Sequence, residues 1–169
     1  ITNIKNLEKK IGVKLTNNQK FIEFSPLSYK FLKIISEKIN NFNGGLLIID
    51  YGFLEKKMKN TLQSVYKHNF NYIFNKLAKS DITHNLNFFL LERIAKKLNL
   101  KVGGLANQGK FLINLGILKR AEILTKNLRF SKKADIYYRL KRLIDNNFMG
   151  ELFKVMFLTK KNNKFNVGF

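Results

Sequence analysis

The feature that most restricts the fold of this chain is the aliphatic run in GGLLIIDYG, residues 44–52. The four large residues that follow the two glycines lack the polar alternation of a strand with one solvated face. A continuous run of this kind is typical of a strand that is buried on both faces, as in a parallel sheet. We therefore predict a central parallel strand over residues 46–50, with helices that cover the sheet.

The segment before this strand predicts a helix that leads directly into it. Ser25 suits an N-cap, and Pro26 suits the first helical position, where a missing N–H costs nothing. Apolar residues then recur with a helical period as far as Ile39. The Asn-Gly-Gly sequence at 43–45 predicts the end of this helix. Together with a short strand expected over 21–24, the pattern resembles half of a βαβ unit.

The remaining apolar patterns continue the alternation of strands and helices. Residues 53–86 have no clean period, and a connection of that length is often functional. The other predicted elements are helices over 87–100, 111–128 and 131–147, a short strand and turn over 100–109, and a strand over 151–159. This alternation predicts a layered α/β domain.

Composition excludes several classes of protein. The chain has no cysteine, so disulfide frameworks, cysteine nucleophiles and zinc–thiolate sites are excluded. The two histidines, His68 and His84, match no metal-binding spacing, and we interpret them as surface residues without a metal. No apolar run approaches the roughly 20 residues that span a bilayer. The first ten residues resemble neither a secretion signal nor a transit peptide.

These features predict a cytoplasmic protein from a bacterium with an AT-rich genome, with the mitochondrial matrix as the alternative. The formal net charge is +21, which is compatible with a nucleic-acid partner. However, the lysines are scattered over nearly every segment instead of forming one stripe, and Lys, Asn, Ile and Phe are abundant together. We interpret the charge as coding bias and keep nucleic-acid binding as an alternative.

Polar residues end the predicted central strand. Asp50, Tyr51 and Gly52 follow the aliphatic run, and ligands of open α/β sheets bind beyond the carboxyl ends of the strands. Glycine at position 52 permits close backbone approach or a positive φ. The alternative is that Asp50 only caps a turn.

Six short segments resemble motifs of one family, in the family's order. They are FIEFSP (21–26) for "E-x-S-P", GGLLIIDYG (44–52) for "GG-x-x-L-I-I-D-Y-G", TLQSVYKH (61–68) for "T-L-Q-A-V-x-x-H", DITHNLNF (81–88) for "D-L-T-A-x-V-D-F", NQGKFLINLGILKRAE (107–122) for "T-Q-G-x-F-L-x-x-L-G-I-x-x-R-A", and MGELFKV (149–155) with the final VGF. In this order they resemble the MidA family of class I S-adenosylmethionine (SAM)-dependent methyltransferases. That family includes a mitochondrial complex I assembly factor that methylates an arginine of a complex I subunit.

The resemblance covers only the C-terminal half of the family's domain. Family members begin with a strand that ends in a glycine-rich "E-x-G-x-G-x-G" loop, which holds the cofactor, and this sequence contains no such loop. The resemblance therefore implies an α/β fold that is the C-terminal half of a Rossmann-like sheet with flanking helices, a single partial domain over residues 1–169. It implies SAM as the cofactor, although we do not expect this fragment to bind SAM alone. The implied partner is a separate N-terminal half or a protein substrate.

Three positions depart from the family's motifs. Asn60 and Asn87 replace aspartates, and Asn107 replaces a threonine. Two carboxylates have thus become amides, which accept hydrogen bonds but carry no charge. If either carboxylate orients a substrate, this chain has lost that function.

The resemblance also implies a site. Methyl transfer needs alignment of donor and acceptor more than a strong acid or base. A carboxylate would hold an arginine acceptor through paired hydrogen bonds, and Asp50 and Asp81 are the candidates. Tyr51 would pack against the cofactor or gate the acceptor, and Gly52 is the candidate cofactor contact.

Two alternatives to an active half-domain stay open at this point, an inactive remnant or interaction module and a basic nucleic-acid-binding protein. A half-sheet would leave strand 46–50 at an edge, with unpaired backbone groups and apolar faces. We therefore expect the isolated chain to be marginally stable or to pair with another polypeptide.

Overall fold

A computed structural model describes residues 2–16 and 19–169 of the chain. Its helices are α1 (Thr2–Ile11), α2 (Pro26–Phe42), α3 (Phe88–Lys97), α4 (Gln108–Asn114), α5 (Ile117–Thr125), α6 (Phe130–Ile144) and α7 (Met149–Leu152). Its strands are β1 (Gly45–Phe53), β2 (Gln63–Tyr66), β3 (Asn69–Asn71), β4 (Asp81–Thr83), β5 (Leu86–Asn87), β6 (Leu100–Asn107) and β7 (Phe153–Lys160). The expected α/β class is therefore confirmed.

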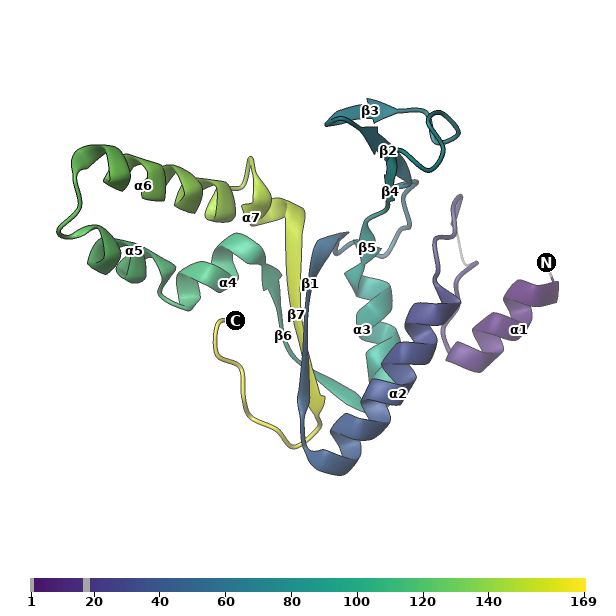
Figure 1. Ribbon diagram of the computed structural model, residues 1–169. Helices are drawn as coiled ribbons and strands as arrows, with labels where there is room; N and C mark the ends of the chain where they lie inside the picture. The colour runs from purple at the N-terminus through teal and green to yellow at the C-terminus, as the bar shows by residue number, and fades with distance from the viewer. Residues whose placement is uncertain (1, 17–18) are drawn as a thin grey trace.

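A four-stranded sheet in the order β5-β1-β7-β6 forms the centre of the molecule (Figure 1). β7 pairs antiparallel with β1 on one side and with β6 on the other. β5 pairs parallel with β1 over two residues only, Gly52 opposite Leu86 and Phe53 opposite Asn87. The expectation that β1 is a central parallel strand is wrong, because its long pairing with β7 is antiparallel.

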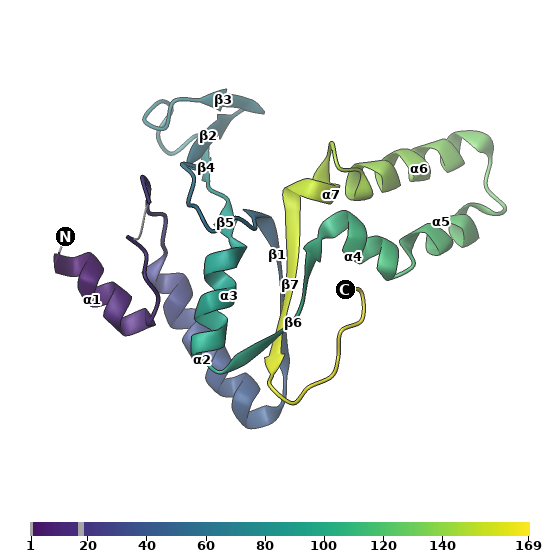
Figure 2. The same ribbon diagram turned by 180° about the vertical axis from the view of Figure 1, so that it is seen from behind.

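Each face of this sheet packs against different elements. α2 and α3 lie on one side, while α4 to α7 and the C-terminal segment lie on the other, as the two opposite views show (Figures 1 and 2). The larger core lies beneath α2 and α3 and includes Met156 and Leu158 of β7 and Phe88 of α3, all 0% exposed. A smaller core joins Phe111 of α4 to Val155 and the C-terminal Phe169.

The helix before β1 forms as predicted. The Ser25 side chain accepts a hydrogen bond from the Ser28 N–H, which satisfies one free donor of the first turn. The helix ends at Asn43, whose φ of 58° is the left-handed conformation of a C-cap. The tight connection then places Gly45 at the first position of β1.

Other expectations were wrong in detail. Residues 21–24 are not a strand, and residues 53–86 contain the small antiparallel sheet β3-β2-β4. The helix expected over 111–128 is two helices, because Gly116 has a φ of +83° that an α-helix cannot contain. α1 was not predicted at all.

β1 is an edge strand over most of its length, as the half-sheet predicts. From Gly45 to Tyr51 it pairs with β7 alone among the described residues. The expected burial on both faces is wrong, because Leu47 and Ile49 are 47% and 48% exposed. β1 also contains no lysine or proline, the residues with which many proteins protect an exposed edge.

A buried carboxylate fixes the segment that follows α1. Glu8 is 7% exposed, and its Oε1 accepts hydrogen bonds from the N–H groups of Leu15 and Thr16 at 2.6 and 2.8 Å and from the Thr16 hydroxyl. The Thr16 N–H is the main cause that lowers the pKa of Glu8 below its ordinary value of 4.5, and the Leu15 N–H and Lys14 lower it further. Burial opposes this shift, but the hydrogen bonds outweigh it.

Glu8 should make stability depend on pH in acid. Because its folded-state pKa is lowered, its contribution is complete above about pH 4.5 and is lost as the pH falls through the folded-state pKa. We expect the urea midpoint of Glu8→Gln to lie below that of the wild type at neutral pH, with the difference shrinking below pH 4.5. Urea unfolding of both proteins at several pH values measures this difference. A difference that stays constant from pH 7 to pH 3 would contradict the assignment.

Candidate functional site

The carboxyl end of β1 presents Asp50 and Tyr51 to solvent. Asp50 is exposed, and its Oδ1 accepts a hydrogen bond from the Tyr51 N–H at 2.8 Å. Tyr51 is 40% exposed, and its ring centroid lies 4.2 Å from that of Phe153 on β7. Both predicted residues therefore lie at one open edge of the sheet, but as consecutive residues of a strand their side chains point to opposite faces.

Asp50 lies at the end of a polar row that crosses three strands. It pairs with Lys154 of β7, which in turn pairs with Asn107 of β6. Lys154 is only 5% exposed, and its Nζ donates to the carboxylate of Glu151 at 2.7 Å and to the Glu151 backbone carbonyl. Asn107 also donates to the Glu151 carboxylate. Sequence reasoning missed Lys154 and Glu151. Only strand pairing places Lys154 opposite Asp50, and Glu151 of α7 joins this row through its contacts with Lys154 and Asn107.

Gly52 has a packing role that the sequence did not reveal. A Cβ at this position would lie 2.5 Å from the Leu86 carbonyl oxygen and 2.5 Å from the ring of Phe88. Its φ is not in the positive range that favours glycine. The glycine therefore allows β5 and α3 to approach β1, while its role as a cofactor contact stays a prediction.

Asp81 lies apart from the Asp50 edge in the sheet pairing. It is an exposed residue of β4, opposite Val65 of β2 in the three-stranded sheet. No hydrogen bond or ion pair joins it to Asp50 among the residues that the structure describes. A joint role of the two aspartates in holding one guanidinium stays a prediction.

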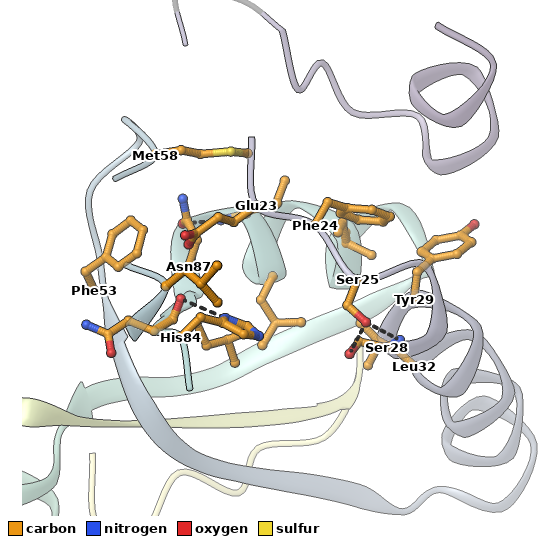
Figure 3. A pocket seen from close by; sticks show the side chains of 16 residues that line it. Glu23, Phe24, Ser25, Ser28, Tyr29, Leu32, Phe53, Met58, His84 and Asn87 are labelled. Carbon is orange, nitrogen blue, oxygen red and sulfur yellow. Dashed lines mark hydrogen bonds between the residues drawn. The ribbon is translucent and has the colours of Figure 1, made fainter. Parts of the chain in front are cut away.

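A pocket lies between α2 and α3, next to the end of β1 (Figure 3). Its cavity volume is about 240 Å³. The lining is mainly apolar and comes from residues 23–25, Ser28, Tyr29, Leu32, Phe53, Met58, Leu62, residues 84–87, Leu90, Leu91 and Ile94. Figure 3 shows Glu23, Asn87, Phe53 and His84 toward one end and Ser25, Ser28 and Tyr29 toward the other.

Three of the sequence motifs meet at this pocket. The Glu23 carboxylate accepts from the Thr61 N–H at 2.8 Å and from the Thr61 hydroxyl at 2.6 Å. The Thr61 hydroxyl oxygen accepts from the Asn85 N–H at 3.0 Å. Segments 21–26, 61–68 and 81–88 are therefore joined at one wall. The sequence analysis recognised these three motifs but predicted none of their pocket-lining residues as site residues. The signal that could have revealed the pocket is that the three motifs occur together in one chain.

His84 lies at this pocket, whereas His68 lies in the turn between β2 and β3 with a φ of 65°. Among residues 2–16 and 19–169, no group of three or more His, Cys, Asp or Glu residues could hold a metal ion. In the same part of the chain, no helix is long and apolar enough to cross a membrane.

Comparison with known proteins defines the class to which this fold and these motifs belong. Residues 1–106 match the family model Methyltransf_28, described as "Putative S-adenosyl-L-methionine-dependent methyltransferase". The match covers more than half of the chain, which therefore belongs to this family of SAM-dependent methyltransferases. The resemblance that the sequence motifs indicated is confirmed, and SAM is the cofactor of the family.

The curated relatives are mitochondrial enzymes. The chain is 24% identical over 134 residues to the protein arginine methyltransferase NDUFAF7 of Xenopus tropicalis and 29% identical over 103 residues to that of Rattus norvegicus. These matches cover 79% and 61% of this chain but only 31% and 23% of the relatives. The chain thus spans less than a third of the length of these relatives.

Two solved structures from Burkholderia thailandensis share the fold. One is a COG1565 superfamily protein that aligns with a TM-score of 0.75 and 21% identity, covering 90% of this chain and 42% of that protein. The other, a COG1565 superfamily member bound to S-adenosyl-homocysteine, aligns with a TM-score of 0.66 and 23% identity over 79% of this chain and 35% of that protein. More than half of each structure therefore lies outside the part that this chain matches.

The residues at the Asp50 edge fit only part of a cofactor site. Asp50 offers a carboxylate and Tyr51 a ring, but both lie on an open surface. The space beside Gly52 is filled by Phe88 and the Leu86 carbonyl, and the sequence has no glycine-rich "E-x-G-x-G-x-G" loop. We therefore derive no methyl-transfer step from these residues alone.

Proposed function

We propose that this chain is the C-terminal part of a SAM-dependent methyltransferase domain that acts on an arginine of a protein. The family match over residues 1–106 carries this proposal. The arginine acceptor follows from the curated relatives, which are protein arginine methyltransferases. By the resemblance of its motifs, the acceptor belongs to a respiratory complex I subunit, in the bacterial cytoplasm or the mitochondrial matrix.

The domain needs a further segment to bind its cofactor. This segment corresponds to the N-terminal half of the relatives and is supplied by the same polypeptide or by a second one. The unpaired edge of β1 supports this proposal, since Gly45 to Tyr51 form sheet hydrogen bonds on one side only among the described residues. The half-exposed side chains of Leu47 and Ile49 support it as well, because an added layer would bury them.

Calorimetric titration with SAM tests the proposal. We expect no binding to this chain alone and saturable binding to its mixture with the N-terminal half of a close relative, because the mixture completes the sheet and the cofactor site. Leu47→Asp together with Ile49→Asp should abolish binding in the mixture, since charges at the new interface would stay unpaired. Phe130→Asp, at a side chain that is 86% exposed on α6, is the matched control and should bind as the wild type does.

The other outcomes favour the alternatives. Absence of binding in the mixture, with both polypeptides shown to be folded, would contradict the proposal and favour an inactive remnant or an interaction module. Nucleic-acid binding with a steep loss of affinity in salt would favour a basic nucleic-acid-binding protein.

A further inference from the structure

Helices α5 and α6 form an arm that projects from the rest of the molecule. In both views the connection between these helices lies at the end of the arm farthest from the sheet (Figures 1 and 2). The buried side chains of the two helices are Ala121 and Thr125 of α5 and Leu140 of α6. We call residues 123–133, which form the far end of the arm, the tip.

Large apolar side chains are exposed at the tip. Phe130 is 86% exposed, Ile123 is 66% exposed and Leu124 is 54% exposed. None of the three belongs to either hydrophobic core of the described structure, so the fold of this chain does not use them in packing. Exposed apolar residues that are gathered in one place, instead of scattered singly, indicate a surface that a partner covers.

The tip is also strongly cationic. It has no acidic residue and four cationic ones, Lys126, Arg129, Lys132 and Lys133. In the part of the chain that the structure describes, the ion pairs of the arm are Lys119–Glu122 and Arg139–Asp135. Neither pair includes a cation of the tip. Its positive charge is therefore available to an anionic partner.

The arginines of the chain are concentrated in the same arm. The lysines are scattered over nearly every segment, but four of the five arginines lie within residues 117–144. A coding bias toward lysine does not explain this concentration. Arginine binds phosphate groups through paired hydrogen bonds, which lysine cannot form. The arm is thus suited to a partner that carries phosphate groups.

An anionic membrane surface matches both properties of the tip. Apolar side chains enter the boundary between headgroups and acyl chains, while lysines and arginines attract anionic headgroups. A nucleic acid would match the charge, but the exposed aliphatic side chains of Ile123 and Leu124 offer no flat face on which a base can stack. A protein partner would need a groove shaped for this projecting tip, whereas a bilayer needs none.

We propose that the tip of the α5–α6 arm binds the surface of membranes that contain anionic phospholipids. Phe130, Ile123 and Leu124 enter the lipid, and the four cations of the tip bind the phosphate headgroups. The proposal does not depend on methyl transfer, because it rests on residues of the arm alone.

A fluorescent reporter at the tip tests the insertion directly. The chain has no tryptophan, so Phe130→Trp introduces a single one. The probe is a vesicle of phosphatidylglycerol and phosphatidylcholine in equal parts. We expect these vesicles to shift the emission of Phe130→Trp to shorter wavelength, and lipids with brominated acyl chains to quench it. Vesicles of phosphatidylcholine alone, which carry no net charge, should cause a much smaller shift.

Phe74→Trp is the matched control for this reporter. Phe74 is 85% exposed, lies between β3 and β4, and has Lys76 nearby in the sequence. If the net charge of +21 merely adsorbed the chain to the vesicle, the two variants should respond alike. We expect Phe74→Trp to keep its emission, because adsorption through the tip leaves this side chain in water.

Variants of the tip measure what its side chains contribute to vesicle binding. Lys126→Gln, Arg129→Gln and Lys132→Gln together should weaken binding in co-sedimentation by more than tenfold, because each cation near an anionic surface adds to the attraction. Ile123→Ser with Leu124→Ser keeps the charge and should weaken binding about tenfold, because less apolar surface leaves water.

A control of equal charge completes the experiment. Lys56→Gln, Lys161→Gln and Lys164→Gln together remove the same charge from exposed positions outside the arm and should weaken binding clearly less. Far-ultraviolet circular dichroism confirms that each variant is folded. The proposal is overturned if excess anionic vesicles leave the emission of Phe130→Trp unchanged or shift that of Phe74→Trp equally. It is also overturned if the folded tip variants bind vesicles as tightly as this control and instead lose affinity for an RNA oligonucleotide.

Discussion

Replacing Leu158 by alanine is expected to lower the free energy of unfolding by about 2–5 kcal/mol. Leu158 is 0% exposed and belongs to β7, the strand that pairs with both β1 and β6. Its side chain is part of the core beneath α2 and α3, so its removal leaves a cavity that the paired strands cannot close. Urea unfolding followed by circular dichroism measures the loss.

The matched control is Leu47→Ala, which removes the same atoms from a side chain that is 47% exposed in the same sheet. Its cost should be clearly smaller, because less apolar surface returns to water. If the wild type is less stable than the expected loss, Leu158→Ala will be unfolded without urea while Leu47→Ala still unfolds cooperatively. Equal stability of the two variants would contradict the burial of Leu158 in the core between β7 and the helices α2 and α3.

The substitution Gly52→Ala should destabilise the protein by about 1–3 kcal/mol. The added methyl group would lie 2.5 Å from the Leu86 carbonyl oxygen, which is backbone and cannot rotate away. It would also meet the ring of Phe88, which is fully buried. The two-residue pairing of β5 with β1 must therefore shift, and with it Asn87 at the pocket.

Gly44→Ala provides the control for this substitution, because a Cβ at Gly44 would meet nothing within 4 Å. Thermal unfolding of the two variants compares a blocked position with an open one just before the same strand. We expect Gly44→Ala to unfold within about 2 °C of the wild type, because surface changes without lost contacts cost little. A Gly52→Ala protein as stable as Gly44→Ala would rule out close packing of β5 on β1.

The sequence predicted correctly those helix ends that depend only on neighbouring residues. Ser25 and Pro26 start α2, and the Asn-Gly-Gly sequence ends it, because caps and breakers act within one turn of a helix. β1 was predicted from its aliphatic run. Its antiparallel partner was not, because β7 lies more than a hundred residues away and periodicity carries no information about pairing.

The candidate site was predicted less completely than the fold. Asp50 and Tyr51 lie at the expected strand end, since the aliphatic run itself marks that position. The pocket residues Glu23 and Asn87 come from segments that are far apart in the sequence and meet only in the folded protein. Hydrogen bonds from Thr61 hold Glu23, and Asn87 is held as the N-cap of α3. The motif resemblance identified these segments by their order along the sequence. Only the structure shows that they enclose one cavity.

The place of β7 in the sheet also determines when the sheet can form. Gly44 and Thr159, which join β1 to β7 through a hydrogen bond, are 115 residues apart in the sequence. On the ribosome, β1 and β6 both emerge before the strand that lies between them, so their pairing waits for residues 153–160. Closing so long a loop is entropically costly and slows folding. Until then the aliphatic strand is exposed in the nascent chain, which makes it a natural target for the chaperones that bind unfinished proteins.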